Sequence, residues 1–449
     1  MESKSLKSST IFYPYIIAAL FFLPFILNNA AFNDDYYKQL WGESHFMQDG
    51  RPVAEFILRF FSLSHFTVDN ISPLTWILSI LILGSTCVTV SKRLSGNSNL
   101  WVGAFSSLIF CTPAFLENAF FKFDNLTMSV ALSLAVLAAI KTISGFKNFL
   151  LVTVMVLGYL CSYQLAMTSY VIISLMLFLV NYINNNDHKN NIADLFLKAV
   201  ALIVGFIIYS LIKPLMPISV YAMETGKISS FNDMFSNVIG GTVKYANMTI
   251  SVYDRLSLFV IAFCSLISVL FIAYKVVLAL RNSTTLYGVL SSCIAIVAVP
   301  VSLFMIIAPL TILQSQPEYL RLLIGLGSYV YMVTILSCMA VSGSRRLCNF
   351  LIIISFIPVI DAVTKSYVVN NAYQSQYELS KGISIGVLDS LSAANVSGLS
   401  QIMYTTYGPL SYEAERVMKD YPFSRKIIRS GFVAIPHWAG YDHPSKVKV

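Results

Sequence analysis

Two charged motifs in the first long polar segment contain residue types that could do chemistry. Asp34 and Asp35 are adjacent and directly follow the first long apolar run, and Asp49-Gly50-Arg51-Pro52 comes shortly afterwards. A carboxylate can act as a general base, and a fixed guanidinium can grip a phosphate through two hydrogen bonds. Adjacent side chains point in different directions, so we expect only one of the two acids to face a reaction.

Each motif alone has a simpler interpretation. An acidic pair often caps a helix or keeps a loop solvated. However, charge placed next to a bilayer is costly unless something uses it. The closeness of the two motifs, just where the chain leaves an apolar run, favours a site.

The composition identifies the chain as a polytopic membrane protein. Of its 449 residues, 56% are hydrophobic and 12% are charged, about half the charged share of a soluble domain. Continuous apolar runs without period-two alternation favour helices over a barrel. The predicted fold class is therefore an all-α polytopic membrane protein. The net charge of +8 is explained by basic loops that orient the chain, so nucleic-acid binding is not expected.

A membrane span needs about 20 apolar residues. On that basis the sequence predicts eleven spans, with a polar break at Cys161-Ser162-Tyr163-Gln164 that divides a long apolar region into two short helices. The predicted spans cover residues 11–31, 73–90, 99–116, 126–140, 149–161, 165–183, 197–216, 256–279, 287–310, 323–341 and 347–362.

The short basic loops all fall on one side if every predicted span crosses, which places the N-terminus in the cytoplasm. The long polar segments then lie outside, including a first loop at 32–72. We therefore predict a transmembrane domain over 1–362 and a small ordered outer domain over 363–449, with the C-terminus outside.

Further candidate residues gather at the same outer boundary. A short loop carries Glu117, Lys122 and Asp124, which could bind sugar hydroxyls, and Tyr163 and Gln164 would project from the polar break. Arg321 and Lys213 could hold a lipid phosphate. The simpler alternatives are interfacial anchoring, buried polar pairing and snorkelling. The histidines show no metal-ligand spacing, so no metal site is predicted, although the paired acids could bind a divalent cation.

These motifs resemble those of a known family. Asn33-Asp34-Asp35-Tyr36 with Asp49-Gly50-Arg51-Pro52 is similar to the opening of the bacterial O-antigen glucosyltransferases carried by serotype-converting phages. The Thr112–Asn118 run with Phe123-Asp124-Asn125, the segment Ser162–Ala166, and Asn371-Ala372-Tyr373-Gln374 look like further signatures. The chain departs from the family pattern at Tyr36-Tyr37-Lys38, where a glycine and an arginine are expected. This departure leaves the basic partner of the acidic pair open.

The resemblance implies a class C glycosyltransferase that needs no cofactor. It would move glucose from polyprenyl-phosphate-glucose to a lipid-linked O-antigen acceptor on the periplasmic face of the bacterial inner membrane, with inversion. Asp34 or Asp35 would be the base. Arg51, Arg321, Lys122 and Lys213 would contact the donor phosphate, and Glu117, Asp124, Tyr163, Gln164 and Asp49 would contact sugar.

Two other classes of membrane protein fit the hydropathy pattern less well. A flippase or transporter of polyprenyl-linked sugars would be expected to carry charges at mid-span, and the predicted spans contain very few. Another outer-face transferase, such as a ligase, would favour a large late outer loop rich in basic and histidine residues.

Overall fold

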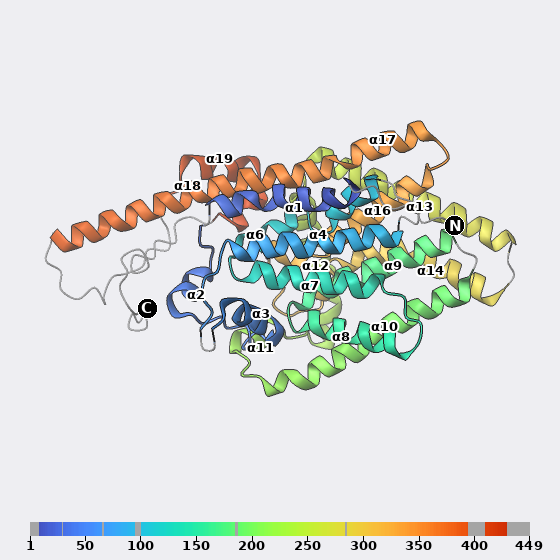
Figure 1. Cartoon of the computed structure of the whole chain (residues 1–449), viewed down its shortest axis with the longest axis horizontal. Coiled ribbons are helices and arrows are strands. Elements are labelled where there is room, and N and C mark those ends of the chain that lie inside the picture. Colours follow the sequence, from blue (N-terminus) through green and yellow to red (C-terminus); the bar gives the residue numbers. More distant parts are fainter. Residues whose placement is uncertain are drawn as a thin grey trace.

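The structure is a computed structural model, and it describes residues 9–28, 30–64, 67–94, 100–184, 187–282, 285–393 and 409–428. This part of the chain is built from helices, with one isolated bridge between Ile228 and Leu313. Most helices run side by side along the long axis of the molecule (Figure 1). Their bundling is expected, because a backbone in lipid must satisfy its hydrogen bonds within each segment.

The helices of the first half, where η denotes a 3₁₀-helix, are α1 (Ser9–Asn28), α2 (Asp35–Trp41), α3 (Pro52–Ser62), α4 (Leu74–Leu94), α5 (Leu100–Ser106), η1 (Ser107–Ile109), η2 (Pro113–Phe115), α6 (Leu116–Phe120), α7 (Asp124–Ile140), α8 (Phe146–Leu160), η3 (Gln164–Ala166), α9 (Met167–Asn184), α10 (His188–Ile212) and η4 (Lys213–Leu215). Those of the second half are α11 (Val220–Thr225), α12 (Phe231–Ser251), α13 (Arg255–Asn282), α14 (Leu286–Met305), α15 (Ala308–Thr311), η5 (Leu320–Leu323), α16 (Leu326–Ala340), α17 (Arg345–Ser355), α18 (Ile357–Ala393), α19 (Tyr412–Asp420) and η7 (Pro422–Lys426).

Seven helical segments of the described chain are long and apolar enough to cross a membrane: Leu74–Leu94, Gln164–Asn184, His188–Leu215, Arg255–Arg281, Leu286–Met305, Leu320–Ala340 and Arg345–Gly386. Three shorter apolar helices are Phe12–Asn28, Asp124–Ile140 and Phe146–Leu160. These ten segments coincide with ten of the predicted spans. The count of eleven and the orientation of the termini stay predictions.

The expected span at 99–116 has a different form. In the described residues from Leu100 onwards, α5 lasts only seven residues and gives way to η1 and then to η2. Pro113 explains the interruption, because proline disfavours a helical residue before it. Thr112 accordingly has extended backbone angles, with φ −135° and ψ 150°. The prediction of one helix here was wrong, because proline chemistry outweighed hydropathy.

The polar break predicted after residue 160 is present. α8 ends at Leu160, and α9 begins at Met167 after the short turn of η3. The carbonyl oxygen of Cys161 accepts a hydrogen bond of 3.1 Å from the backbone N–H of Val53 at the start of α3. The break therefore serves as a contact point for the first loop.

The last long helix passes the beginning of the chain. α18 runs without interruption across residue 362 and packs against α1, so a helix from late in the sequence lies beside the first helix (Figure 1). α19 packs on α18 in turn. The predicted outer domain over 363–449 falls partly outside the described residues, at 394–408 and 429–449, and stays a prediction.

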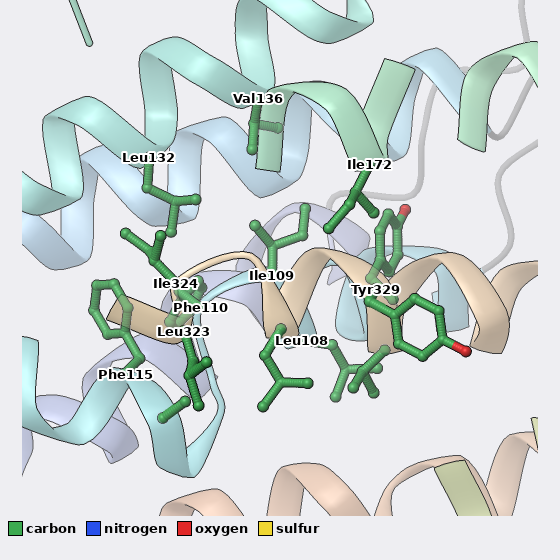
Figure 2. Close-up of a cluster of buried hydrophobic side chains, with 14 of the residues drawn as sticks. Leu108, Ile109, Phe110, Phe115, Leu132, Val136, Ile172, Leu323, Ile324 and Tyr329 are labelled. Carbon is green, nitrogen blue, oxygen red and sulfur yellow. The ribbon is translucent and has the colours of Figure 1, made fainter. Parts of the chain in front are cut away.

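The core is tightest where the interrupted segment meets its neighbours. Leu108, Ile109 and Phe110 pack against side chains of α7, α9, η5 and α16 (Figure 2). Gly327 allows this approach, because a Cβ atom there would overlap with the carbonyl oxygens of Leu108 and Ile109. Backbone atoms cannot move aside as a flexible side chain can.

Gly327→Ala should destabilise the protein by about 1–3 kcal/mol, the usual cost of overpacking. Thermal unfolding in detergent, followed by fluorescence, measures the change. Gly382→Ala on α18 is the matched control, because no neighbouring atom lies within 4 Å of its added Cβ. An unchanged melting temperature in Gly327→Ala would contradict the close packing described here.

Candidate functional site

A single large cavity, about 1490 Å³ in volume, brings most of the predicted site residues together. Its walls come from the first loop, the break after α8, η4, the turn before η5, and α18. The predicted residues that line it are Asp34, Asp49, Arg51, Asp124, Tyr163, Gln164, Lys213 and Arg321. Asp35, Glu117 and Lys122 do not line it.

The two adjacent acids occupy different environments. Asp34 stands just before α2, is exposed, and lines the cavity, and its side chain makes no hydrogen bond that caps the helix. Asp35 is completely buried. Its Oδ2 accepts hydrogen bonds from the backbone N–H of Phe32 at 3.2 Å and of Lys122 at 2.9 Å. Of the pair, only Asp34 can meet a ligand in the cavity, while Asp35 joins two loops.

Burial changes the acidity of Asp35. Loss of solvation raises the pKa of its carboxyl group to about 7, although the nearby Lys38 charge and the backbone N–H of Lys122 act in the opposite direction. Burial likewise raises the pKa of Asp49, against the influence of Arg51. Desolvation disfavours the charged form of a carboxyl group.

Lys38 supplies a basic partner, but to a different acid than the sequence suggested. Its Nζ forms a buried ion pair with the carboxylate of Asp124 at the start of α7. The same ammonium lies 4.6 Å from the ring centroid of Phe46 and 5.9 Å from that of Phe123. The sequence predicted a site role for Asp124 but assigned none to Lys38. The pair fixes α2 against α7, close to Asp34.

Several cations that line the cavity form no ion pair with another described residue. They are Arg51, Lys213 and Arg321, which we call the cation set, and Arg425, whose Nε donates to the carbonyl oxygen of Met418. The guanidinium of Arg51 lies 5.3 Å from the ring centroid of Tyr163. Cations held near aromatic rings, without a carboxylate, are suited to bind an anion from outside.

Arg321 is positioned through its backbone. Its N–H donates a 3.0 Å hydrogen bond to Oε2 of Glu117, and its carbonyl oxygen accepts a 2.9 Å hydrogen bond from the hydroxyl of Tyr163. The guanidinium lies 4.8 Å from the ring centroid of Phe121 and 4.7 Å from that of Tyr319. Glu117, predicted to bind sugar, thus lies behind the cavity wall and supports a cation.

The turn before Arg51 depends on Gly50. Its φ is +72°, in the left-handed region that favours glycine, and a Cβ atom there would lie 2.8 Å from the hydroxyl oxygen of Tyr209. That hydroxyl donates to the carbonyl oxygen of Gly50 at 3.1 Å and accepts from Nε2 of Gln164 at 2.8 Å. Tyr209 and Gln164 thereby hold the turn that presents Arg51.

Apolar and aromatic side chains complete the cavity. An apolar flank comes from the ends of α8, α10 and α15 and from the turn into α9, and consists of Leu160, Leu165, Met167, Phe206, Leu310 and Leu313. Aromatic side chains of α2 and α18 form another part of the lining. Hydropathy alone could not indicate which apolar residues face a cavity.

Comparison with known proteins places the chain in a family. The model of the glucosyl transferase GtrII family matches residues 23–341, well over half of the chain. The chain belongs to the GtrII glucosyltransferase family. Among curated proteins, it is 23% identical over 420 residues to an uncharacterised 55.3 kDa protein in the gtrB 5′ region of Salmonella phage P22, covering 92% of this chain and 84% of that one. No solved structure matches the chain.

The family match covers most of the charged residues of the cavity and leaves out the last long helix. The GtrII match contains Asp34, the cation set and the ion pair of Lys38 with Asp124, but it ends before α18. In the described part of this GtrII member, no group of three His, Cys, Asp or Glu side chains could hold a metal ion. The predicted resemblance to O-antigen glucosyltransferases is confirmed at the level of the family, and a glycosyltransferase activity follows from membership.

The contribution of the Asp35 carboxyl to the free energy of unfolding should fall as pH rises. Its pKa rises from 3.8 to about 7 in the folded chain, so the folded state holds the proton longer than the unfolded state. The stability it contributes is complete below about pH 4 and is lost as pH rises through 7. The melting temperature of wild type minus that of Asp35→Asn should therefore decrease from pH 5 to pH 8. The exposed Asp69→Asn variant should show no such trend, and a difference that grows with pH would refute the assignment.

Proposed function

We propose that this GtrII member transfers glucose from a polyprenyl-phosphate donor to a sugar hydroxyl of a lipid-linked O-antigen unit, with Asp34 as the general base. One observation carries the proposal. The carboxylate of Asp34 shares a cavity with an apolar flank and with the cation set, which forms no ion pair with another described residue. Such a cavity suits a ligand with a phosphate, a sugar and a hydrocarbon chain.

The proposed donor matches the cavity part by part. Its phosphate would contact the ammonium of Lys213 and the guanidinium groups of Arg51 and Arg321, and both guanidinium groups are held beside aromatic rings before any ligand binds. The first units of its polyprenyl chain would lie against the apolar flank. The glucosyl group would then lie near Asp34, with Asp49 and Gln164 able to bind its hydroxyls.

The reaction follows from this placement. The acceptor hydroxyl attacks the anomeric carbon as Asp34 takes its proton, and a new glycosidic bond forms. The bond from the anomeric carbon to the phosphate oxygen breaks, and the polyprenyl phosphate leaves with the electron pair. Attack opposite the leaving group inverts the anomeric configuration. The cation set stabilises the charge that develops on the phosphate.

The proposed location follows the charge pattern of the loops. We place the chain in the bacterial inner membrane with the cavity at the periplasmic side, where a lipid-linked acceptor and a lipid-borne donor can meet. The N-terminus would be cytoplasmic and the C-terminus periplasmic.

Replacement of the two adjacent acids should have unequal effects. Asp34→Asn should lower kcat by about 100- to 10,000-fold, the usual contribution of a general base. Asp35→Asn should retain measurable transfer, because that group does not line the cavity. The assay follows labelled glucose from polyprenyl-phosphate-glucose to a lipid-linked O-antigen acceptor, with Asp69→Asn as the matched first-loop control. Full activity in Asp34→Asn would remove the proposed base.

Loss of a guanidinium from the cation set should weaken the use of donor. Arg51→Gln and Arg321→Gln should each lower kcat/KM for the donor by about 10- to 100-fold, the range of a hydrogen bond to a charged group. The bonds from Glu117 and Tyr163 to the backbone of residue 321 stay available in Arg321→Gln, which limits structural damage. Arg416→Gln, at an exposed position on α19, is the control. Unchanged donor kinetics in both variants would contradict the phosphate assignment.

A further inference from the structure

One part of the cavity lining differs in chemistry from the cation set. It comes from α2 and from the middle of α18, and it consists of the aromatic wall, Tyr36, Trp41, Tyr373 and Tyr377, together with Gln376 and Ser380. All six side chains are uncharged, and each except Ser380 carries a flat ring or amide. The proposed transfer mechanism uses none of them.

The aromatic wall has a defined geometry. The rings of Tyr36 and Tyr377 are stacked, with centroids 6.4 Å apart and planes 23° from parallel. Tyr373 donates a 2.6 Å hydrogen bond from its hydroxyl to the carbonyl oxygen of Ala31, and its ring packs 5.6 Å from that of Phe32. The wall therefore spans α18 and the segment that leads into α2, and both sides are fixed.

Gln376 is fixed from the C-terminal side. Its Nε2 donates to the carbonyl oxygen of Pro409 at 3.2 Å, and its Oε1 accepts from the backbone N–H of Ser411 at 2.8 Å. These bonds attach the start of α19 to α18. Met418 and Arg425, which follow, also line the cavity. The wall is thus built before ligand binds, so binding would not have to order it.

The chemistry of this wall suits a neutral sugar better than a phosphate. A pyranose has one face of C–H groups, which packs on an aromatic ring, and an edge of hydroxyls, which hydrogen bonds with phenols and amides. Tyrosine combines both features in a rigid side chain. Burial raises the pKa of the Tyr36 hydroxyl, which also hydrogen bonds with Tyr373, so this phenol keeps its proton at neutral pH. A phosphate would instead favour the cation set.

The aromatic wall includes a residue close in sequence to the proposed base. Tyr36 lies two residues after Asp34, in the first turn of α2. The wall residues on α18 lie beyond residue 341, where the GtrII match ends. A sugar held on the wall would therefore lie in the same cavity as the proposed base, partly on a segment that the family model does not match.

We propose that the aromatic wall, with Gln376 and Ser380, is the acceptor subsite, where an uncharged pyranose of the acceptor saccharide stacks and presents its hydroxyl to Asp34. The proposal rests on the proposed glucosyl transfer. It assigns the residues that select the acceptor, whereas the cation set binds the donor.

Kinetics with each substrate varied separately test this assignment. The variants are Tyr377→Ala and Trp41→Ala, with Tyr377→Phe to retain the ring without its hydroxyl. Tyr412→Ala on α19 is the matched control, because that side chain is 85% exposed and does not line the cavity. Purified protein in detergent receives labelled polyprenyl-phosphate-glucose and an undecaprenyl-linked O-antigen repeat unit.

The acceptor KM should rise at least about tenfold in both alanine variants, with the donor KM within twofold of wild type. Tyr377→Phe should restore most of the acceptor affinity, and Tyr412→Ala should match wild type. An unchanged acceptor KM in both alanine variants would overturn the proposal. So would equal losses for donor and acceptor, since the wall would then act on the whole cavity. The donor KM also reports whether each variant is folded.

A direct binding measurement separates this proposal from the transfer reaction. Saturation-transfer NMR would detect binding of the oligosaccharide released from the repeat unit by mild acid. If wild type transfers no glucose but binds this oligosaccharide, and Tyr377→Ala does not, the subsite stands and the transfer reaction fails. If wild type transfers glucose and Tyr377→Ala binds the oligosaccharide equally well, transfer stands and the subsite fails.

Discussion

The buried carboxyl group of Asp35 joins two loops that are far apart in the sequence, and the position of Asp34 depends on that junction. Two backbone N–H groups, one from each loop, meet the same oxygen atom. The ion pair of Lys38 with Asp124 adds a second link between α2 and α7. Removing one partner of a buried pair leaves an uncompensated charge, so these links are costly to break. They fix α2, a helix of only seven residues.

The cation set, in contrast to Lys38 and Asp124, forms no ion pair with another described residue. Arg51 and Arg321 lie beside aromatic rings, and the hydrogen bonds nearby hold the turns that carry them without involving an ion pair to either guanidinium. Burial costs these groups solvation, and in the empty protein the aromatic rings and more distant acids such as Glu117 offset that cost. The surrounding apolar bundle, which needs no charge, provides the rigidity that keeps these groups in place.

The sequence predicted the helices well because hydropathy reports directly on burial in lipid. Ten of the eleven predicted spans coincide with apolar helices, and the polar break after residue 160 is present. The prediction of one helix over 99–116 was wrong, because the segment is broken before Pro113. Most of the predicted site residues do line one cavity. However, the sequence could not divide the roles of Asp34 and Asp35, because which side chain is buried depends on Lys122, far away in the chain.

Other contacts in the site could not be predicted from the neighbouring sequence. Lys38 looked like a departure from a family pattern, and only the fold brings it to Asp124. Tyr36 and Tyr377 are more than 300 residues apart, and their stacking follows from the packing of α18 beside α1. Contacts of this kind depend on topology rather than on pattern.

The packing of α18 against α1 has a consequence for biosynthesis. Residues near the start of the chain, such as Ala31 and Phe32, leave the ribosome first, whereas Tyr373, which contacts both, emerges more than 300 residues later. The cavity therefore cannot be complete during most of translation and insertion. A chain released early, at any point before α18, would carry Asp34 and Arg321 without the residues that close the cavity around them. The cavity would thus be complete only after the chain has been made through α19 and η7, and unfinished chains would be inactive in the membrane.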